Sequence, residues 1–366
     1  MALNAADVHG GRAGTGTPPD DGAAPRARLL DACRLRAVDR TPVWLMRQAG
    51  RYLPEYRALR EKHTLLEICR LPEVTTQVTL QPLRRFALDG AIIFADILLP
   101  LVPMGASLRF AQNEGPVIEQ GVATAADVER LGPVIPEESL APTLEALGLI
   151  RRELRPDVAL IGFAGAPFTL ASYLIEGGSS RRFTRTKSFM YNEPAAFHRL
   201  MAKLARVTAD WLVAQVRAGA NIVQLFDSWV GWLGPDDYRA FVAPHMPVIF
   251  DAVRATGAPA IHFGVDTGGL LELMRECGGE VIGLDWRTPL AQGWRRIGPA
   301  HGVQGNLDPA VLFGPHNAIE RRVRDIIANA GGRAGHIFNL GHGIMPETPL
   351  DAVTVLIDTV HATALP

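Results

Sequence analysis

ALIGFAGAPFTLASYLIEGG, residues 159–178, is the stretch that decides the fold. It begins with the continuous apolar run 159–163, which is typical of a strand buried on both faces. Small residues follow as a turn, and then a longer amphipathic run that carries Tyr173. A strand, a turn and a helix in this order predict one β/α unit of a parallel sheet.

The same pattern recurs along the chain. Short apolar runs stand at 42–46, 91–94, 159–163, 221–226, 258–263, 281–284, 302–304 and 336–340, and the run at 302–304 is the weakest strand candidate. Helical patterns lie between them, for example at 195–218, 270–277 and 319–330. Eight such repeats predict an α/β fold, a single (β/α)8 TIM barrel with insertions over residues 26–366. A doubly wound sheet is the alternative, but no glycine-rich GxGxxG follows the first strand.

Composition excludes several classes of protein. Among 366 residues, 37 are basic and 38 acidic, so the formal charge of −1 lacks the basic excess typical of nucleic-acid-binding proteins. No apolar run reaches the roughly 18 residues that a membrane span needs. Residues 1–25 are rich in Gly, Pro and Asp and contain no secretory segment. We therefore expect a disordered N-terminal tail and a cytoplasmic protein with neither nucleic acid nor membrane as partner.

The three cysteines are Cys33, Cys69 and Cys277, an odd number with no CxxC spacing. This pattern predicts buried free thiols in a reducing compartment rather than a zinc site or a redox dithiol.

Polar residues stand where the predicted strands end. In a barrel these carboxyl ends form one rim, where active sites lie. For any single residue the alternative is a turn or a helix cap, most strongly so for Asp266 and Asn306. The rim residues are Arg47, Asp96, Asp227, Ser228, Asp266, Asp285, Asn306 and His342.

The densest signal is TPVWLMRQAGRYLPEYR, residues 41–57. Residues 26–60 hold nine arginines against Asp31, Asp39 and Glu55, a local charge of +6. Gly50 permits a tight or positive-φ turn between Arg47 and Arg51. Two such arginines can each bind a carboxylate through two hydrogen bonds, although pairing with distant acids is the structural alternative.

Four other residues, at the rim or on a helix, have side chains that could bind a ligand or take part in a reaction. Asp96 ends an apolar run, where a carboxylate needs hydrogen bonds or positive charge, so it is a helix cap, an ion-pair partner or an acceptor for ligand N–H groups. Tyr173 offers a hydroxyl or is a core tyrosine. Ser228 lacks the GxSxG elbow of a nucleophile, so a hydrogen-bonding role is simpler. His342, between two glycines, can bind a carboxylate, transfer a proton or be structural.

At these residues the chain resembles the uroporphyrinogen decarboxylase family. The stretches 41–57 and 162–178 are similar to its two signatures, and FADI, FDSW and NLGHGI match further strand ends in order, over residues 26–360. The resemblance implies one TIM barrel with neither cofactor nor metal, forming a homodimer whose two clefts face each other. It also implies removal of CO2 from the four acetate arms of the polyanionic substrate uroporphyrinogen III, giving coproporphyrinogen III in haem biosynthesis.

The resemblance also implies roles for single residues. Asp96 would accept the pyrrole N–H groups and, with Arg47, be catalytic, while Phe226 would line an apolar wall. The proton donor stays open between Arg47, Tyr173, His342 and water. Some members of the family carry histidine where this chain has Trp229. The implied substrate-binding residues are Arg47, Gln48, Ala49, Gly50, Arg51, Asp96, Tyr173, Phe226, Ser228 and His342.

Two other functions compete. Zinc- and thiol-using methyltransferases of related fold hold zinc through a His-x-Cys strand motif, but here Gly264 follows His262 and Phe263, and Cys277 does not repair the pattern. A non-catalytic tetrapyrrole-binding protein would keep Arg47 and Arg51 but would not need Asp96.

Overall fold

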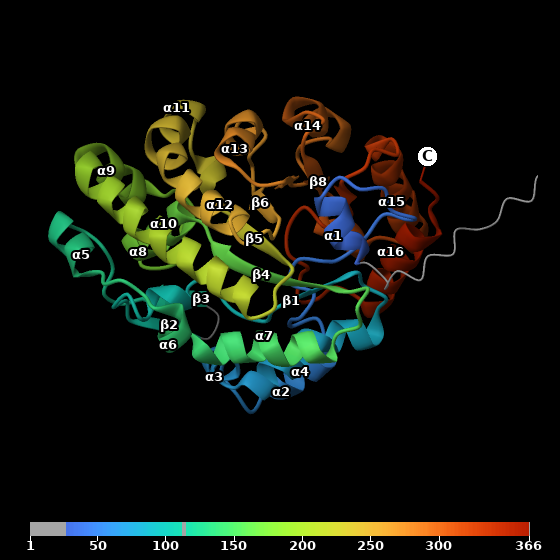
Figure 1. Ribbon diagram of the computed structural model, residues 1–366, viewed down its shortest axis with the longest axis horizontal. Coiled ribbons are helices and arrows are strands. Elements are labelled where there is room, and N and C mark those ends of the chain that lie inside the picture. The colour runs from blue at the N-terminus through green and yellow to red at the C-terminus, as the bar shows by residue number, and fades with distance from the viewer. Residues whose placement is uncertain (1–26, 112–114, 366) are drawn as a thin grey trace, which may run out of the picture.

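Figure 1 shows a computed structural model of the chain, in which residues 27–111 and 115–365 are described. The expected disordered tail, residues 1–25, lies outside the described residues. Seven parallel strands form one sheet, and each strand pairs with its neighbour in sequence order. A doubly wound sheet would reverse its strand order, so this order rejects that alternative. The strands are β1 (Gly90–Ile92), β4 (Ala159–Gly165), β5 (Ile222–Asp227), β6 (Ala260–Gly264), β7 (Val281–Gly283), β8 (Gly302–Gln304) and β9 (His336–Ile337).

The sheet curls strongly. Gln304 on β8 donates a hydrogen bond from Nε2 to Oε1 of Gln224 on β5, at 3.0 Å, although two strands separate them. In a flat sheet such strands would lie roughly 14 Å apart, because neighbouring strands are spaced by about 4.8 Å. Trp44 donates to Oε1 of Gln304 at 2.9 Å, so this buried polar chain also reaches the segment that precedes the sheet.

That segment, residues 42–46, was predicted as a strand and is extended, but it forms a single parallel bridge, Val43 to Phe338, rather than a ladder. Phe338 N donates to the carbonyl of Pro42 at 2.9 Å, on the β9 side. Asp89 N, directly before β1, donates to the carbonyl of Val43, also at 2.9 Å. Residues 42–46 therefore hydrogen-bond to both outer edges of the sheet.

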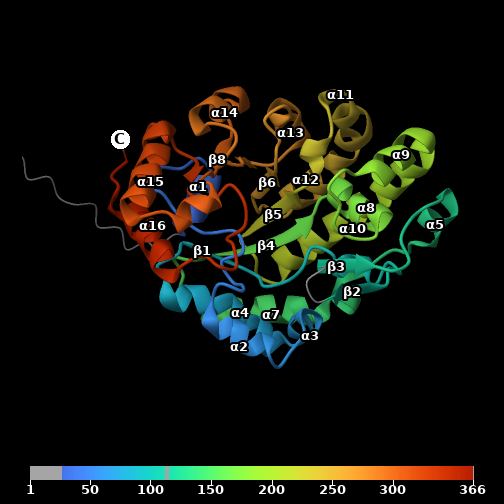
Figure 2. The same cartoon turned by 180° about the vertical axis from the view of Figure 1, so that it is seen from behind.

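Helices surround the sheet and cover its outer face (Figures 1 and 2). The predicted helices at 195–218, 270–277 and 319–330 are confirmed as α10, α13 and α15. The described helices are α1 (Arg28–Cys33), α2 (Pro54–Arg60), α3 (Leu65–Arg70), α4 (Pro72–Arg85), α5 (Ala125–Arg130), α6 (Pro136–Ser139), α7 (Ala141–Glu153), α8 (Pro167–Glu176), α9 (Thr184–Asn192), α10 (Pro194–Arg217), α11 (Pro235–Asp237), α12 (Met246–Arg254), α13 (Leu271–Cys277), α14 (Leu290–Ile297), α15 (His316–Ala330) and α16 (Leu350–Ala362).

The first and last helices lie on the same side of the molecule (Figures 1 and 2) and meet at one buried carboxylate. Asp89 is 3% exposed and accepts two hydrogen bonds from Arg40, at 3.0 and 2.9 Å, and one from Val43 N at 2.9 Å. Arg28 of α1 and His361 of α16 approach the same carboxylate. Asp89 thus joins the beginning and the end of the fold at the amino ends of the strands.

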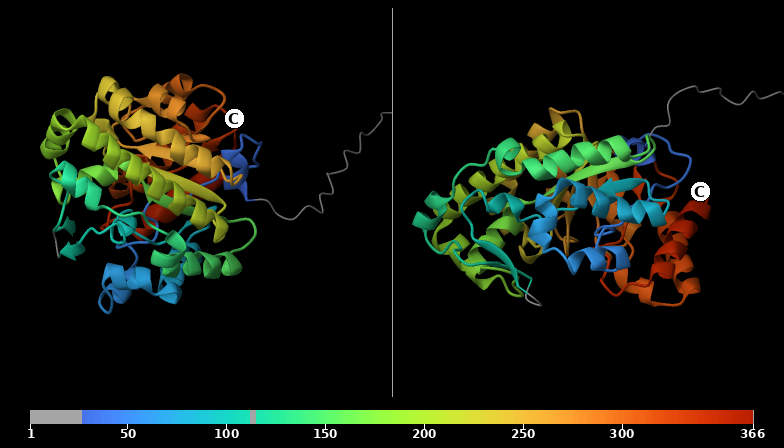
Figure 3. Two further views of the ribbon diagram at one scale, coloured as in Figure 1. Left: turned by 60° about the vertical axis from the view of Figure 1, so that its left-hand side comes forward. Right: turned by 90° about the horizontal axis from the view of Figure 1, so that it is seen from below.

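A hairpin of β2 (Leu108–Ala111) and β3 (Gly115–Ile118) stands apart from the sheet and was not predicted (Figure 3). Ile118 N donates to the carbonyl of Gly177, just after α8, at 2.9 Å, which attaches the hairpin to that helix end.

The core is continuous from the sheet to the helices, and the three cysteines are buried and free, as predicted. Within the described ranges, no helix is both long and apolar enough to cross a membrane.

Candidate active site

The rim of the sheet at the carboxyl ends of the strands gathers most of the predicted site residues. We use "the rim" for these positions and the loops that follow the strands. Arg47, in the loop after residue 46, has neighbours in two directions along the rim. In one direction lie His342 and Trp286. In the other direction lie Asp96, Tyr173 and Trp229.

The loop after the first extended segment is held from below by Gln48. This side chain is fully buried, donates from Nε2 to the carbonyl of Gly90 at 2.9 Å, and accepts from Leu45 N at 3.0 Å. Both amide ends are thus used within the protein, so Gln48 shapes the loop and its side chain is not free for a ligand. The buried Ala49 packs beneath the same loop.

Positive φ in this loop falls on Arg47, at 63°, and not on Gly50 as expected. Such a conformation is uncommon for a residue with a side chain and is typical of functional sites. Gly50 has another reason to be glycine, since a Cβ there would lie 3.1 Å from the carbonyl oxygen of Arg47. The turn is therefore tight, as predicted, but the strained residue is the arginine itself.

The Arg47 side chain lies across Gly343, where a Cβ would approach its Cγ to 2.8 Å and its Nε to 2.9 Å. Neither Arg47 nor Arg51 has a carboxylate within 4.0 Å among the described residues, and both are exposed. The alternative in which these two arginines pair with distant acids therefore does not apply in the described part of the chain.

Three other arginines of the +6 segment behave differently. Arg28 pairs with Asp39, Arg36 with Asp31 at 3.2 Å, and Arg40 with the buried Asp89. Their charge is neutralised near the amino ends of the strands. The positive excess that remains at the rim is that of Arg47 and Arg51.

Asp96 follows β1 and is partly buried. Its Oδ1 accepts a hydrogen bond from Leu98 N at 2.8 Å, and the described residues provide no second hydrogen bond to the carboxyl group. Burial raises the pKa of Asp96, while the Leu98 hydrogen bond and the nearby charge of Arg47 lower it. One oxygen is thus fixed and the other is open to a donor from a ligand.

Tyr173 on α8 and the loop after β5 form the next part of the rim. The ring of Tyr173 packs on Trp229 with centroids 3.9 Å apart. Burial, and then the charge of Asp96, raise the pKa of Tyr173 to about 12, so the hydroxyl stays protonated at neutral pH. Ser228 is partly buried between Asp227 and Trp229.

Asp227 does not point to the rim as expected. It is fully buried and accepts a hydrogen bond from Oγ1 of Thr169 at 3.0 Å, and Thr169 in turn accepts from Trp229 N at 3.2 Å. Burial raises the pKa of Asp227 to about 7. Asp227 and Thr169 therefore tie α8 to the loop that carries Ser228.

Along this row of neighbouring residues, Arg47 stands between Asp96 and His342. Burial, and then the positive charges of Arg47 and Arg287, lower the pKa of His342 to about 4. The imidazole is therefore neutral at pH 7, and offers one N–H donor and one acceptor nitrogen rather than a positive charge.

Asp285 also turns away from its expected place. It is 1% exposed and accepts from Asp266 N at 2.7 Å and from the guanidinium of Arg287 at 2.8 Å. Reasoning from the sequence missed two residues of this loop, the partly buried Trp286 and the exposed Arg287. Trp286 and Arg287 follow Asp285 directly in the sequence. The rule that strand ends form the rim would have been sufficient to find them.

Three further residues have structural roles, and of these Asp266 has the turn role that was predicted. Asn306 is buried and donates to the carbonyls of Asp285 and Thr288 at 2.8 and 2.6 Å. Asp266 has a positive φ of 58°, as a turn residue does. His262 is fully buried against Phe250, with centroids 5.1 Å apart.

An aromatic layer lies below the rim inside the curled sheet. Phe226 on β5 packs edge-to-face on Phe163 of β4 and Phe263 of β6, with centroids 5.6 and 5.9 Å apart. Phe226 is partly exposed, so it offers an apolar surface next to the charged residues.

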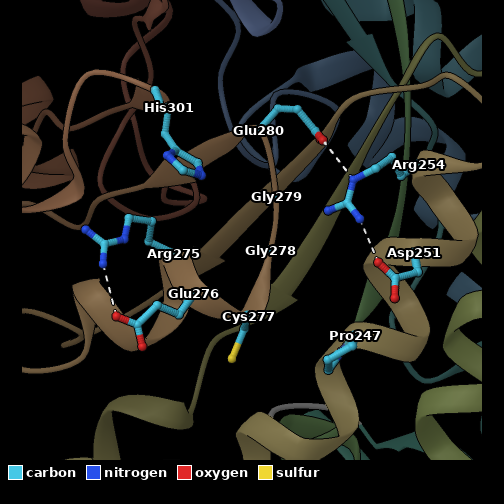
Figure 4. Close-up of a pocket in the computed structure, with 11 residues that line it drawn as sticks. Pro247, Asp251, Arg254, Arg275, Glu276, Cys277, Gly278, Gly279, Glu280 and His301 are labelled. Carbon is cyan, nitrogen blue, oxygen red and sulfur yellow. Dashed lines mark hydrogen bonds and ion pairs between the residues drawn. The ribbon is translucent and has the colours of Figure 1, made fainter.

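A cavity of about 420 Å³ is not part of the rim (Figure 4). It is lined by residues that precede β7 and β8, at the amino ends of the strands. Its cations are already paired, Arg254 with Asp251 at 2.6 Å and Arg275 with Glu276 at 3.0 Å. Across the described ranges, no group of three or more His, Cys, Asp or Glu side chains gathers as metal ligands would.

Comparison with known proteins identifies relatives over nearly the whole chain. The family described as uroporphyrinogen decarboxylase (URO-D) matches residues 24–363. A uroporphyrinogen decarboxylase of Sorangium cellulosum is 58% identical over 335 residues, which are 92% of this chain and 96% of that protein. One of Thermus thermophilus is 53% identical over 336 residues, 92% of this chain and 98% of that protein.

Solved structures support the fold. A methyltransferase from Methanosarcina mazei superposes with a TM-score of 0.71 at 20% identity, covering 91% of this chain and 97% of that one. A B12-independent methionine synthase from Shewanella reaches a TM-score of 0.55 at 9% identity, covering 89% and 94%. At these identities the likeness concerns the fold alone.

Proposed function

The chain belongs to the uroporphyrinogen decarboxylase family, and from this premise we propose that it is an enzyme of haem biosynthesis that decarboxylates uroporphyrinogen III. The reaction converts the four acetate arms to methyl groups and gives coproporphyrinogen III and CO2. The two uroporphyrinogen decarboxylases named above align with this chain over almost their whole length, which supports the same reaction here.

One observation in the structure carries the proposal. Arg47 and Arg51 stand exposed at the rim without acidic partners in the described chain, and the charge of Arg47 acts on the open carboxylate of Asp96. A substrate with eight carboxylates around a ring of pyrrole N–H groups needs this combination, cations for its periphery and an acceptor for its centre.

The proposed mechanism uses the substrate as its own electron sink. Protonation of a pyrrole α-carbon gives an iminium-like ring, and the acetate arm then loses CO2 as its C–C electrons flow into that ring. A proton taken up on the remaining carbon completes the methyl group, and the α-carbon then releases its proton, which restores the pyrrole and leaves a net uptake of one proton for each CO2 lost. Ionised Asp96, with Oδ1 fixed by Leu98 N, stabilises the developing cation through preorganised electrostatics.

The pKa values of the site residues reduce the number of candidate proton donors. His342, with a pKa of about 4, is neutral at pH 7 and does not donate a proton as an imidazolium. Tyr173, with a pKa of about 12, keeps its proton but releases it with difficulty. We propose that Tyr173 and His342 orient the substrate by hydrogen bonds, with Ser228. The proton that reaches the pyrrole α-carbon then comes from water, because a guanidinium such as that of Arg47 holds its proton even more tightly than a phenol does.

The proposal extends to architecture. We propose that residues 42–46 close the sheet into a (β/α)8 barrel, since they hydrogen-bond at both of its outer edges. A homodimer with facing clefts and a cytoplasmic location follow from the family resemblance. Sedimentation of the purified protein at several concentrations tests the dimer, and a stable monomer would reject it.

The two competing functions are less well supported. In the His-x-Cys position the chain has Gly264, and His262 is buried in the core. A non-catalytic binding protein would have no need of an open, partly buried carboxylate at the rim, which is costly to keep.

The test is anaerobic incubation of the protein with uroporphyrinogen III, followed by chromatography of the products by carboxylate number. We expect intermediates with seven to five carboxylates and then coproporphyrinogen. Asp96→Asn is the matched variant, because the amide keeps the shape and loses the charge. Well-folded wild-type protein that forms no product would reject the proposed function.

A further inference from the structure

We propose that Arg287, in the loop after β7, is a further carboxylate-binding residue of the rim and contributes to recognition of the polycarboxylate substrate. This inference rests on the proposed function, which supplies a ligand with carboxylates around its whole periphery. Arg287 would be a third cation of the rim beside Arg47 and Arg51, and it comes from the loop after β7 rather than from the loop after residue 46.

Contacts connect Arg287 with the rest of the rim. Its Cζ lies 4.1 Å from the centre of the Trp286 ring. The same Trp286 ring meets His342 edge-to-face with centroids 6.4 Å apart. A Cβ on Gly341 would collide with the backbone of Trp286, so the loops after β7 and β9 touch directly. The row of contacts is therefore Arg287, Trp286, His342 and then Arg47.

Arg287 is held in place on its inner side. Asp285, 1% exposed, accepts one hydrogen bond from Nη1 of Arg287 at 2.8 Å and one from its backbone N at 3.2 Å. Asp285 is itself fixed by Asp266 N. Together with the indole face of Trp286, these contacts restrict the guanidinium before any ligand arrives, which reduces the entropy lost on binding.

The outer side of the guanidinium remains available. An arginine side chain offers five N–H donors, and within the described residues the side chain of Arg287 uses only Nη1 for a hydrogen bond. The side chain is 47% exposed. A second carboxylate can therefore bind through Nε or Nη2 without breaking the pair with Asp285.

The charge of Arg287 also acts on the same space as Arg47. Both cations lower the pKa of His342, which places them within electrostatic reach of one imidazole. Arg287 and Arg47 thus act on His342 from two different loops, so a ligand that contacts His342 lies within the field of both cations.

The chain offers a matched control in Arg333. Its Cζ lies over the ring of Trp294 at 4.2 Å, so it has the same arginine–indole packing. It lies in the loop before β9, at the amino ends of the strands, away from the rim. Arg287→Gln and Arg333→Gln therefore remove the same charge and the same stacking at opposite ends of the sheet.

Two measurements test the proposal on the full-length chain. In anaerobic steady-state kinetics, we expect Arg287→Gln to raise the KM for uroporphyrinogen III about tenfold with kcat changed less than threefold, as for loss of one charge-assisted hydrogen bond. Arg287→Lys should recover part of this loss, and Arg333→Gln should match the wild type. In fluorescence titrations, Arg287→Gln should weaken binding of uroporphyrin, the unreactive oxidised ring with the same eight carboxylates, by a similar factor.

The two assays separate the failure of this inference from the failure of the proposed function. Wild-type protein that turns over uroporphyrinogen while Arg287→Gln keeps its KM and its uroporphyrin affinity would overturn the role of Arg287 alone. Wild-type protein that binds uroporphyrin but makes no product would overturn the proposed reaction, and the titrations would still decide whether Arg287 holds a carboxylate. Arg287→Lys guards against a misfolded glutamine variant, and thermal unfolding of each variant checks folding.

Discussion

Replacing Gly343 by alanine should displace the Arg47 side chain while leaving residue 47 an arginine. The new Cβ would lie 2.8 Å from Cγ and 2.9 Å from Nε of Arg47, below the 3.4 Å at which ordinary contact begins. Because these atoms belong to the middle of the arginine side chain, it cannot avoid the methyl group by bending its tip. Arg47 must leave its rotamer and move its guanidinium away from His342.

The size of the effect follows from what Arg47 loses. A charge-assisted hydrogen bond contributes about 1.5–3 kcal/mol, and each 1.4 kcal/mol is a factor of ten. We therefore expect kcat/KM for uroporphyrinogen III to fall roughly ten- to hundredfold. The free energy of unfolding should change by less than about 1 kcal/mol, since Arg47 is exposed and has no ion pair in the described chain.

The assay is anaerobic kinetics on four proteins: wild type, Gly343→Ala, Arg47→Ala and the double variant. If the alanine acts through Arg47, adding it to Arg47→Ala should cost nothing further. Gly269→Ala is the control, because this exposed glycine belongs to another rim loop and a Cβ there meets nothing within 4 Å. Wild-type kcat/KM in Gly343→Ala, or equal losses in both backgrounds, would refute the reasoning.

Three other predictions concern charge. Arg51→Ala should raise the KM for uroporphyrinogen III and make it less sensitive to salt, and a KM equal to that of the wild type at low ionic strength would contradict its carboxylate contact. Burial raises the pKa of Asp227 from 3.8 to about 7, so the native state keeps a proton that the unfolded chain releases, and stability falls as pH rises from about 4 to 7. Asp227→Asn should therefore gain up to about 4 kcal/mol over the wild type between pH 4 and pH 8 in urea unfolding, and a pH-independent difference would reject this. Asp89→Ala leaves Arg40 and Val43 N without their partner, and should lower the free energy of unfolding by about 3–5 kcal/mol, whereas a loss below about 1 kcal/mol would show that the pairing is weak.

The strands could be predicted because burial on both faces leaves a simple record, a continuous apolar run such as 159–163 or 281–284. Even the weak run at 302–304 is a strand, β8. The run at 42–46 was harder, since its residues are extended and buried yet form one isolated bridge and a few backbone hydrogen bonds rather than a ladder. The hairpin of β2 and β3 escaped because its two four-residue strands carry no distinctive alternation.

The site was predictable in its residue types and less so in their directions. Arg47, Asp96 and His342 do gather at the rim, as strand ends in a parallel sheet must. Which side chains face inward depends on distant partners that spacing along the chain does not reveal. Gln48 turns inward to bond Gly90, and Asp285 turns inward to bond Asp266 and Arg287.

The contact between the loops that follow residue 46 and β9 has a consequence for how the protein becomes active. Met46 N donates to Oδ1 of Asn339 across 293 residues of sequence, and Ile344 N donates to the carbonyl of Met46. Arg47 and His342 therefore become neighbours only when the first and last segments of the fold have met. Closing so long a loop carries a large entropic cost that local contacts do not repay. A partly opened molecule can keep β4, β5 and β6 paired and yet have no assembled site, so activity reports on the contact between the first and last segments rather than on secondary structure.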